Sequence, residues 1–74
     1  MDFSKEIIGE RLKKIRIERG LNAIEIAKAV NVSKSAISQI ESGKNAPDIV
    51  TFFELCQLLD CSADWLLGLS DNKN

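Results

Sequence analysis

Four side chains that can hydrogen bond to the edges of nucleic-acid bases lie within one short stretch of the sequence. They are polar, short or flexible, and almost uncharged: Lys34, Ser35, Ser38 and Gln39. Their spacing places them together on the outward side of a helix. A solvated helix face is usually richer in Glu and Lys, whereas these side chains can donate to or accept from base edges at a low desolvation cost. The stretch is therefore either a base-reading surface or an ordinary polar helix face.

The sequence holds little that could make or break covalent bonds. It has no histidine, which removes the usual general base near neutral pH and the commonest metal ligand. Its two cysteines, Cys56 and Cys61, cannot complete a tetrahedral zinc site alone and lack the spacing of a CxxC redox pair. We expect two buried or half-buried free thiols in a protein that is not an enzyme and binds no metal or other cofactor.

Length and charge narrow the possible partners. A chain of 74 residues has room for one domain, and no apolar run approaches the ~20 residues of a membrane span. The first residues lack the basic start and apolar stretch of a signal peptide, so we expect a cytoplasmic protein with no membrane partner. Residues 1–44 carry nine basic and six acidic side chains, whereas residues 45–74 carry one basic and five acidic. The first part can therefore meet an anion while the second stays solvated or meets another protein.

Hydrophobic residues recur at helical spacing throughout the chain, and no strand pattern is present. The first predicted helix covers roughly residues 4–19 and ends before Gly20. The second begins at Asn22, which forms a capping box with Glu25, and stops at Asn31, a residue that tolerates the left-handed backbone. The third runs from a Ser33 cap to about residue 42. The first helix is expected to bury a stripe made of Phe3, Ile7, Ile8, Leu12 and Ile15.

Two further helices complete the predicted domain. Asp48 caps a helix of roughly 49–60, and Ser62 caps a short one that ends near Gly68. Residues 1–69 thus form a single all-α domain of five helices, and residues 70–74 form a polar tail that we expect to be frayed.

The stretch from Ala23 to Ile40 resembles the helix-turn-helix of the phage-repressor family of DNA-binding domains, also called Cro/repressor-like or XRE-type. The resemblance is carried by residues at fixed offsets and extends from about residue 9 to residue 68: Ala27, Asn31, Val32, Ile37, Ile40, the run Glu41-Ser42-Gly43-Lys44, Pro47, and the ending Ser-Ala-Asp-Trp-Leu-Leu-Gly at 62–68. It implies a five-helix lambda-repressor-like domain in which helices two and three form the motif. Two departures stand out: Asn31 replaces the usual turn glycine, and Asn22-Ala23 replaces a frequent Thr-Gln pair.

The resemblance also implies residue roles. It places Lys34, Ser35, Ser38 and Gln39 at the major groove as base contacts. It implies that four further residues contact the DNA backbone: Asn22, Ser33, Lys44 and Asn45. Arg16 and Glu41 are implied to pair between the first and third helices. The basic cluster Arg11, Lys13, Lys14 is expected to be a solvated face in preference to a DNA contact.

The fourth and fifth helices carry more large apolar side chains than one core face should hold. We expect Phe52, Leu59, Trp65 and Leu66 to fill the core. The leftover positions are either further core or a two-fold interface, since repressor-like domains usually bind DNA as symmetric dimers. The predicted interface residues are Phe53, Leu55, Leu67 and Leu69.

Two functions are compatible with these features. The first is a sequence-specific regulator of transcription, expected to be a repressor that binds double-stranded DNA as a homodimer on a partly palindromic operator. The alternative is an antitoxin or adaptor whose main role is to hold a partner protein on the acidic, apolar second half of the chain.

Overall fold

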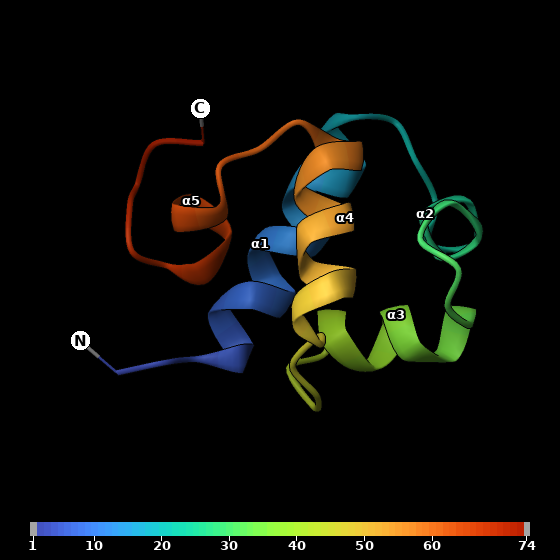
Figure 1. Ribbon diagram of the computed structural model, residues 1–74, viewed down its shortest axis with the longest axis horizontal. Coiled ribbons are helices and arrows are strands. Elements are labelled where there is room, and N and C mark those ends of the chain that lie inside the picture. Colours follow the sequence, from blue (N-terminus) through green and yellow to red (C-terminus); the bar gives the residue numbers. More distant parts are fainter. Residues whose placement is uncertain (1, 74) are drawn as a thin grey trace.

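The computed structural model describes residues 2–73 and contains five helices within them. Their bounds follow in chain order: α1 Lys5–Glu18, α2 Ala23–Ala29, α3 Lys34–Glu41, α4 Ile49–Leu59 and α5 Ala63–Leu67. Helix α3 lies along one edge of the domain and runs across the directions of α1 and α4, while α2 is seen end-on beside it (Figure 1). The predicted all-α class with five helices is confirmed, and no helix in residues 2–73 is long and apolar enough to cross a membrane.

Local capping signals set where the helices begin. The Asn22 side chain accepts from the Glu25 N–H, and the Glu25 carboxylate accepts from the Asn22 N–H, which completes the predicted capping box. Ser33, Asp48 and Ser62 each accept from the backbone N–H three residues later, so the other predicted caps are confirmed as well. The Thr51 backbone N–H bound to Asp48 lowers the pKa of that carboxyl.

The turn between α2 and α3 is closed by the residue types expected there. Asn31 has φ 58°, in the left-handed region, and the Val32 N–H donates to the Ala27 carbonyl at 2.9 Å. Ala27 is buried beneath the turn, where its small side chain lets α2 approach α3 closely. The helix-turn-helix is thus present at the predicted residues.

The core is drawn from all five helices. The four apolar side chains predicted for the core in α4 and α5 are buried. The buried set also includes Ile8, Leu12 and Ile15 of α1, Ile26 and Ala27 of α2, and Ile37 and Ile40 of α3. The predicted α1 stripe is wrong at its start, because Phe3 is 66% and Ile7 37% exposed. Phe3 precedes the helix, so the helical period does not fix its direction.

Gly9 allows α1 to touch α3 backbone to backbone. A Cβ at this position would lie 2.8 Å from the Glu41 carbonyl oxygen and closer still to that of Ile40. Any side chain here would force α3 away from α1. The position of α3 on the domain is therefore set by this close approach.

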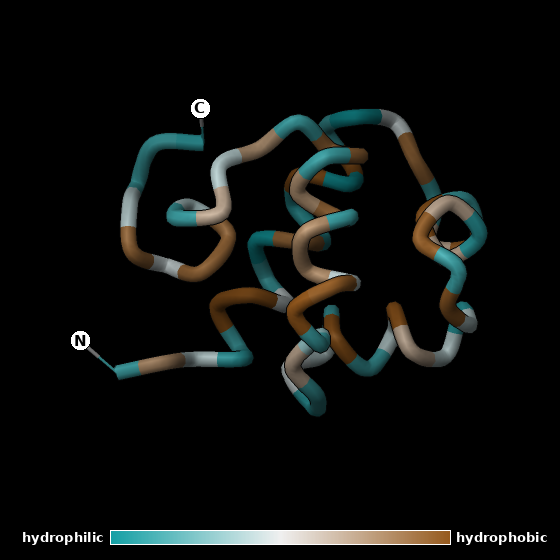
Figure 2. The backbone as a smooth tube through the Cα atoms, in the orientation of Figure 1, coloured by the Kyte–Doolittle hydropathy of each residue, from teal (hydrophilic) through white to brown (hydrophobic). Residues whose placement is uncertain are grey.

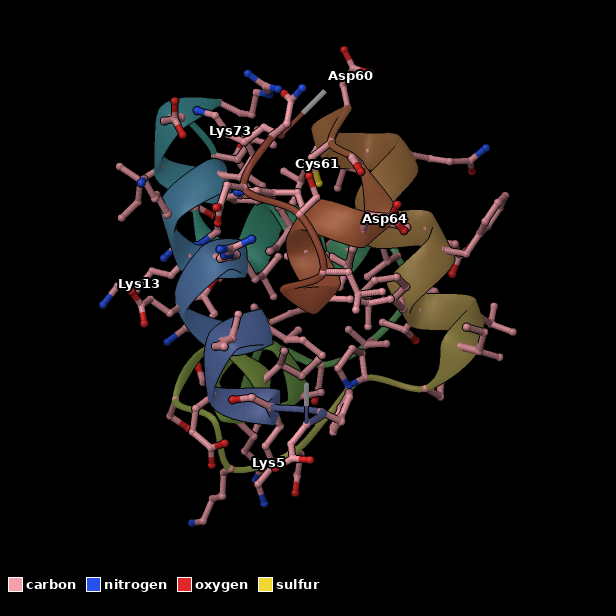
Figure 3. All side chains as sticks on the ribbon, turned by 90° about the vertical axis from the view of Figure 1, so that its left-hand side faces the viewer. Lys5, Lys13, Asp60, Cys61, Asp64 and Lys73 are labelled. Carbon is pink, nitrogen blue, oxygen red and sulfur yellow. The ribbon has the colours of Figure 1, made fainter. Side chains whose placement is uncertain are left out.

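Residues 70–73 of the C-terminal tail lie against the domain and contact it, in contrast to the frayed tail expected from the sequence. The Ser62 N–H donates to the Lys73 carbonyl at 2.7 Å, and the Lys73 ammonium donates to the Glu18 carboxylate at 2.8 Å. Arg11 donates to the carbonyl of Ser70 at 2.7 Å. Figure 3 shows Lys73 beside the C-terminal half of α1, on the side of the molecule that carries the tail. These partners lie more than ten residues away in sequence, which is why local composition did not predict them.

Candidate nucleic-acid interface

The outward face of α3 presents the predicted base-contact residues together. Lys34, Ser35 and Ser38 are exposed, and Gln39 is half-buried near the end of the helix. Ile37 and Ile40 on the opposite side are buried and fix α3 to the core. The outward face of α3 therefore presents hydrogen-bonding groups, and packing against the core sets how the helix is rotated about its own axis.

An ion pair joins the end of α3 to α1. The Arg16 Nε donates to Glu41 Oε2 at 2.6 Å, and Arg16 Nη2 donates to Oε1 at 3.1 Å, so the contact is bidentate. The two side chains are only 13% and 9% exposed. The Glu41 hydrogen bond raises the pKa of the Arg16 guanidinium. Arg16 also donates to the Leu21 carbonyl at 2.9 Å, which links the pair to the start of the motif. The ion pair implied by the resemblance is present, and it offsets the charge of Glu41 at the end of α3.

The two predicted backbone contacts at helix starts keep a donor for an anion. Ser33 uses its hydroxyl oxygen to accept from the Ala36 N–H at 3.0 Å, so its O–H proton can donate outward. Asn22 already uses its backbone N–H and its side-chain oxygen in the capping box, which leaves its Nδ2 group. The Glu25 carboxylate occupies the site at the start of α2 that a phosphate would take at an unblocked helix N-terminus.

The loop after α3 brings together residues that the sequence did not connect. The Asn45 Nδ2 donates to Gln39 Oε1 at 2.6 Å, so the predicted backbone contact touches a predicted base contact. The Lys5 ammonium donates to the Lys44 carbonyl at 3.1 Å, which places a second cation beside Lys44. Figure 3 shows Lys5 beside the loop that follows α3. No local signal could have found either contact, since both depend on how the loop closes.

The basic cluster on α1 divides into two kinds of residue. Lys13 is exposed and points away from the domain in Figure 3, and Lys14 is exposed as well. Arg11 is instead half-buried, donates to the Trp65 carbonyl, and lies 5.2 Å from the centre of the Trp65 ring. A solvated face thus describes the two lysines, while Arg11 ties α1 to α5.

The predicted interface residues on α4 and α5 do not share one environment. Leu55 is fully buried in the core, so its assignment to an interface is wrong. Phe53 and Leu69 are 59% and 62% exposed, and Leu67 is half-buried. The cysteines are half-buried and free, as predicted.

Exposed apolar side chains also occur where the sequence did not place them. Ile49, in the first turn of α4, is 78% exposed, and this turn is brown in Figure 2. Phe3 and Leu67 line two adjoining surface pockets of about 230 and 220 Å³, the first shared with Leu69 and the second with Ile49. We call Phe3, Ile49, Leu67 and Leu69 the apolar patch.

Five helices with a steep α2–α3 crossing, and a polar, capped α3 face held by a largely buried ion pair, define a helix-turn-helix domain of the repressor-like class (Figure 1). The helix-turn-helix family HTH_3 matches residues 12–66, and the chain belongs to this family. The HTH-type transcriptional regulator DicA of Escherichia coli is 32% identical over 99% of this chain. The regulator PrpR of Mycobacterium tuberculosis is 32% identical over 96% of it.

Solved structures give the same fold. The P22 c2 repressor, in a crystal structure with a synthetic operator, superposes with a TM-score of 0.80 and 33% identity, covering 85% of this chain and 96% of that one. The chain spans 54% of the length of DicA and 15% of the length of PrpR. The similarity therefore covers the helix-turn-helix domain and only part of the length of these relatives.

Proposed function

We propose that this protein is a sequence-specific, double-stranded-DNA-binding regulator of transcription that acts as a repressor in the cytoplasm of a bacterium. The observation that carries the proposal is the outward face of α3, where Lys34, Ser35 and Ser38 are exposed and the one acidic residue of the helix, Glu41, is paired with Arg16. Family membership supports it, as does the likeness to a repressor in complex with its operator. Repression would follow from occlusion, since a protein bound across a promoter excludes RNA polymerase.

In the proposed complex α3 enters the major groove. Lys34 is suited to guanine O6 and N7, Gln39 to the edge of adenine, and the hydroxyls of Ser35 and Ser38 to either donors or acceptors. Ser33 at the start of α3, Lys44 in the loop after it and Asn22 at the start of α2 would supply donors for phosphate oxygens. Phosphate contacts set orientation and overall affinity, whereas the base edges supply the discrimination between sequences.

Selection of bound duplexes from a random pool tests this function directly. The wild-type protein is expected to enrich one sequence. Gln39→Ala should then cost about 1–3 kcal/mol on the selected duplex and much less on random DNA. Lys13→Ala is the matched control, because Lys13 is exposed on α1 and points away from the domain. Equal losses on both duplexes would make Gln39 a general contact, and a pool without enrichment would contradict sequence-specific binding.

The apolar patch is proposed to hold a second copy on DNA, together with Phe53, which lies one turn after Ile49 on α4. One domain of this size makes few base contacts, so two domains on a partly palindromic site raise the specificity. A two-fold dimer would place its two α3 helices in successive major grooves, about 34–36 Å and ~10–10.5 base pairs apart. Selected sites are therefore expected to contain two half-sites at that spacing.

Leu69→Glu tests the dimer. It should abolish cooperative binding to the full site while leaving the affinity for a single half-site nearly unchanged. Ile17→Glu is the control, because Ile17 is 59% exposed, as Leu69 is at 62%, but lies on α1 and lines neither pocket of the patch. Cooperative binding by the Leu69→Glu variant would place the interface elsewhere. A one-to-one complex on the full palindrome would exclude the dimer.

We favour this function over that of an antitoxin or adaptor because the relatives compared above are named as transcriptional regulators. A pull-down from the host followed by mass measurement separates the two. A stoichiometric protein partner would support the alternative.

A further inference from the structure

Gln39 is tied to the loop after α3 through both its side chain and its backbone. Asn45 Nδ2 donates to Gln39 Oε1 at 2.6 Å. The Gln39 carbonyl accepts from the backbone N–H groups of Lys44, at 2.9 Å, and Asn45, at 3.2 Å, and from the Ser42 hydroxyl at 3.1 Å. These hydrogen bonds fix the backbone of both residues, and the side-chain amides of Gln39 and Asn45 face each other.

The contact orients an amide that would otherwise turn freely. The terminal torsion of glutamine is broad and roughly two-fold, so an isolated Gln presents either its oxygen or its nitrogen to a ligand. Donation from Asn45 holds the Gln39 oxygen toward the loop and turns Nε2 away from it. Gln39 is half-buried and lines a shallow pocket of about 150 Å³ with Asn45, so this orientation is held at the edge of α3.

We propose that Asn45 is a positioning residue that sets the base preference of Gln39, and not the backbone contact predicted from the sequence. The inference rests on the proposed function, in which α3 enters the major groove. With its orientation fixed, Gln39 donates through Nε2 to a purine N7, and the free lone pair of Oε1 accepts from the N6 amino group of adenine. Guanine offers a second acceptor, O6, at the place of that amino group and is rejected.

If Asn45 orients Gln39, removal of the Asn45 side chain should change the discrimination between adenine and guanine. In Asn45→Ala the Gln39 amide can turn and offer both Nε2 hydrogens to the two acceptors of guanine. Discrimination between adenine and guanine at that position should fall from at least about tenfold to within about threefold. Affinity for random DNA should stay within about twofold, because Asn45 is exposed and holds no charge.

The experiment uses the duplex that the wild-type protein selects. The base pair read by Gln39 is first located as the position where Gln39→Ala no longer distinguishes bases. Dissociation constants are then measured for adenine and guanine at that pair with wild type, Asn45→Ala, Gln39→Ala and the double variant. Asn45→Ala should have no further effect in the Gln39→Ala background. Lys44→Ala is the matched control, since a phosphate contact by the neighbouring lysine should weaken selected and random DNA alike and lower the salt slope by about 0.9. Thermal melting of each variant checks that it is folded.

The outcomes separate this inference from the function on which it rests. Equal losses on selected and random DNA for Asn45→Ala would make Asn45 a backbone contact and overturn the positioning role. Independent, additive losses with Gln39→Ala would overturn it too. A wild-type protein that selects no duplex would overturn the proposed function and this inference with it.

Discussion

Removal of the Glu41 carboxylate should destabilise the domain strongly because it leaves a guanidinium enclosed without its counter-ion. Exposed ion pairs are worth ~0–1 kcal/mol, whereas breaking a buried pair costs about 3–5 kcal/mol. The Arg16 and Glu41 side chains are only 13% and 9% exposed, so little water reaches the pair, and their contact is bidentate. In Glu41→Ala, Arg16 keeps the Leu21 carbonyl as the remaining acceptor described for it. We therefore expect a loss of about 3 kcal/mol in the free energy of unfolding, at the lower end of the range for breaking a buried pair.

Thermal unfolding followed by circular dichroism measures this loss. In a domain of this length 1 kcal/mol corresponds to about 4–8 °C, so the midpoint should fall by about 12–24 °C. Glu10→Ala, at an exposed position on α1, should change stability by no more than about 0.5 kcal/mol. The losses of Arg16→Ala and Glu41→Ala should not add in the double variant, since each single change already breaks the pair. A midpoint lowered by less than about 4 °C would show that water screens the pair and refute the reasoning.

Three other predictions concern the turn, the helix crossing and the thiols. Asn31→Ala should lower the free energy of unfolding by about 1 kcal/mol because Asn tolerates the left-handed φ of 58° better than Ala does, while Asn31→Gly, which removes the Cβ, should leave it unchanged or higher in chemical denaturation. Gly9→Ala should cost about 2–3 kcal/mol or prevent folding, since its Cβ would press on the α3 backbone, and a thermal midpoint like that of wild type would contradict this close approach. Burial raises the pKa of Cys56 to about 11 and also raises that of Cys61. Reaction of the folded protein with a thiol reagent at pH 8 should be slower than that of the unfolded chain and should rise toward pH 11, because the thiolate is the nucleophile.

Features encoded by neighbouring residues could be predicted from the sequence. The caps at Asn22, Ser33, Asp48 and Ser62 each need only a side chain and a backbone N–H three residues later, so residue type and position suffice. The left-handed turn at Asn31 is local in the same way. These signals, with the helical period of the apolar residues, fixed all five helices to within about two residues.

Features set by distant contacts could not be predicted in this way. Eight of the eleven residues of α4 are apolar, more than one face of the helix can hold, so its sequence does not say which of them face the core, and Leu55 was placed on the wrong side. The polar tail was expected to fray because its partners, Arg11 and Glu18, lie on α1. The pairing of Gln39 with Asn45 depends on how the loop folds back over the end of α3. The Arg16–Glu41 pair was expected only through the family resemblance.

Helix α1 contributes none of the predicted base contacts, yet it fixes the helix that does. Its Gly9 permits the close approach of α3, and its Arg16 holds the far end of α3 through Glu41. Discrimination between bases requires donors and acceptors held to within about 0.5 Å, since a bidentate contact that is slightly misplaced loses one of its bonds. In the proposed complex, sequence specificity therefore depends on residues of α1 that contact α3 and read no base themselves. A change at Gly9 or Arg16 that leaves the protein folded should reduce discrimination between DNA sequences more than it reduces binding to DNA in general, because the phosphate contacts tolerate a small shift that the base contacts do not.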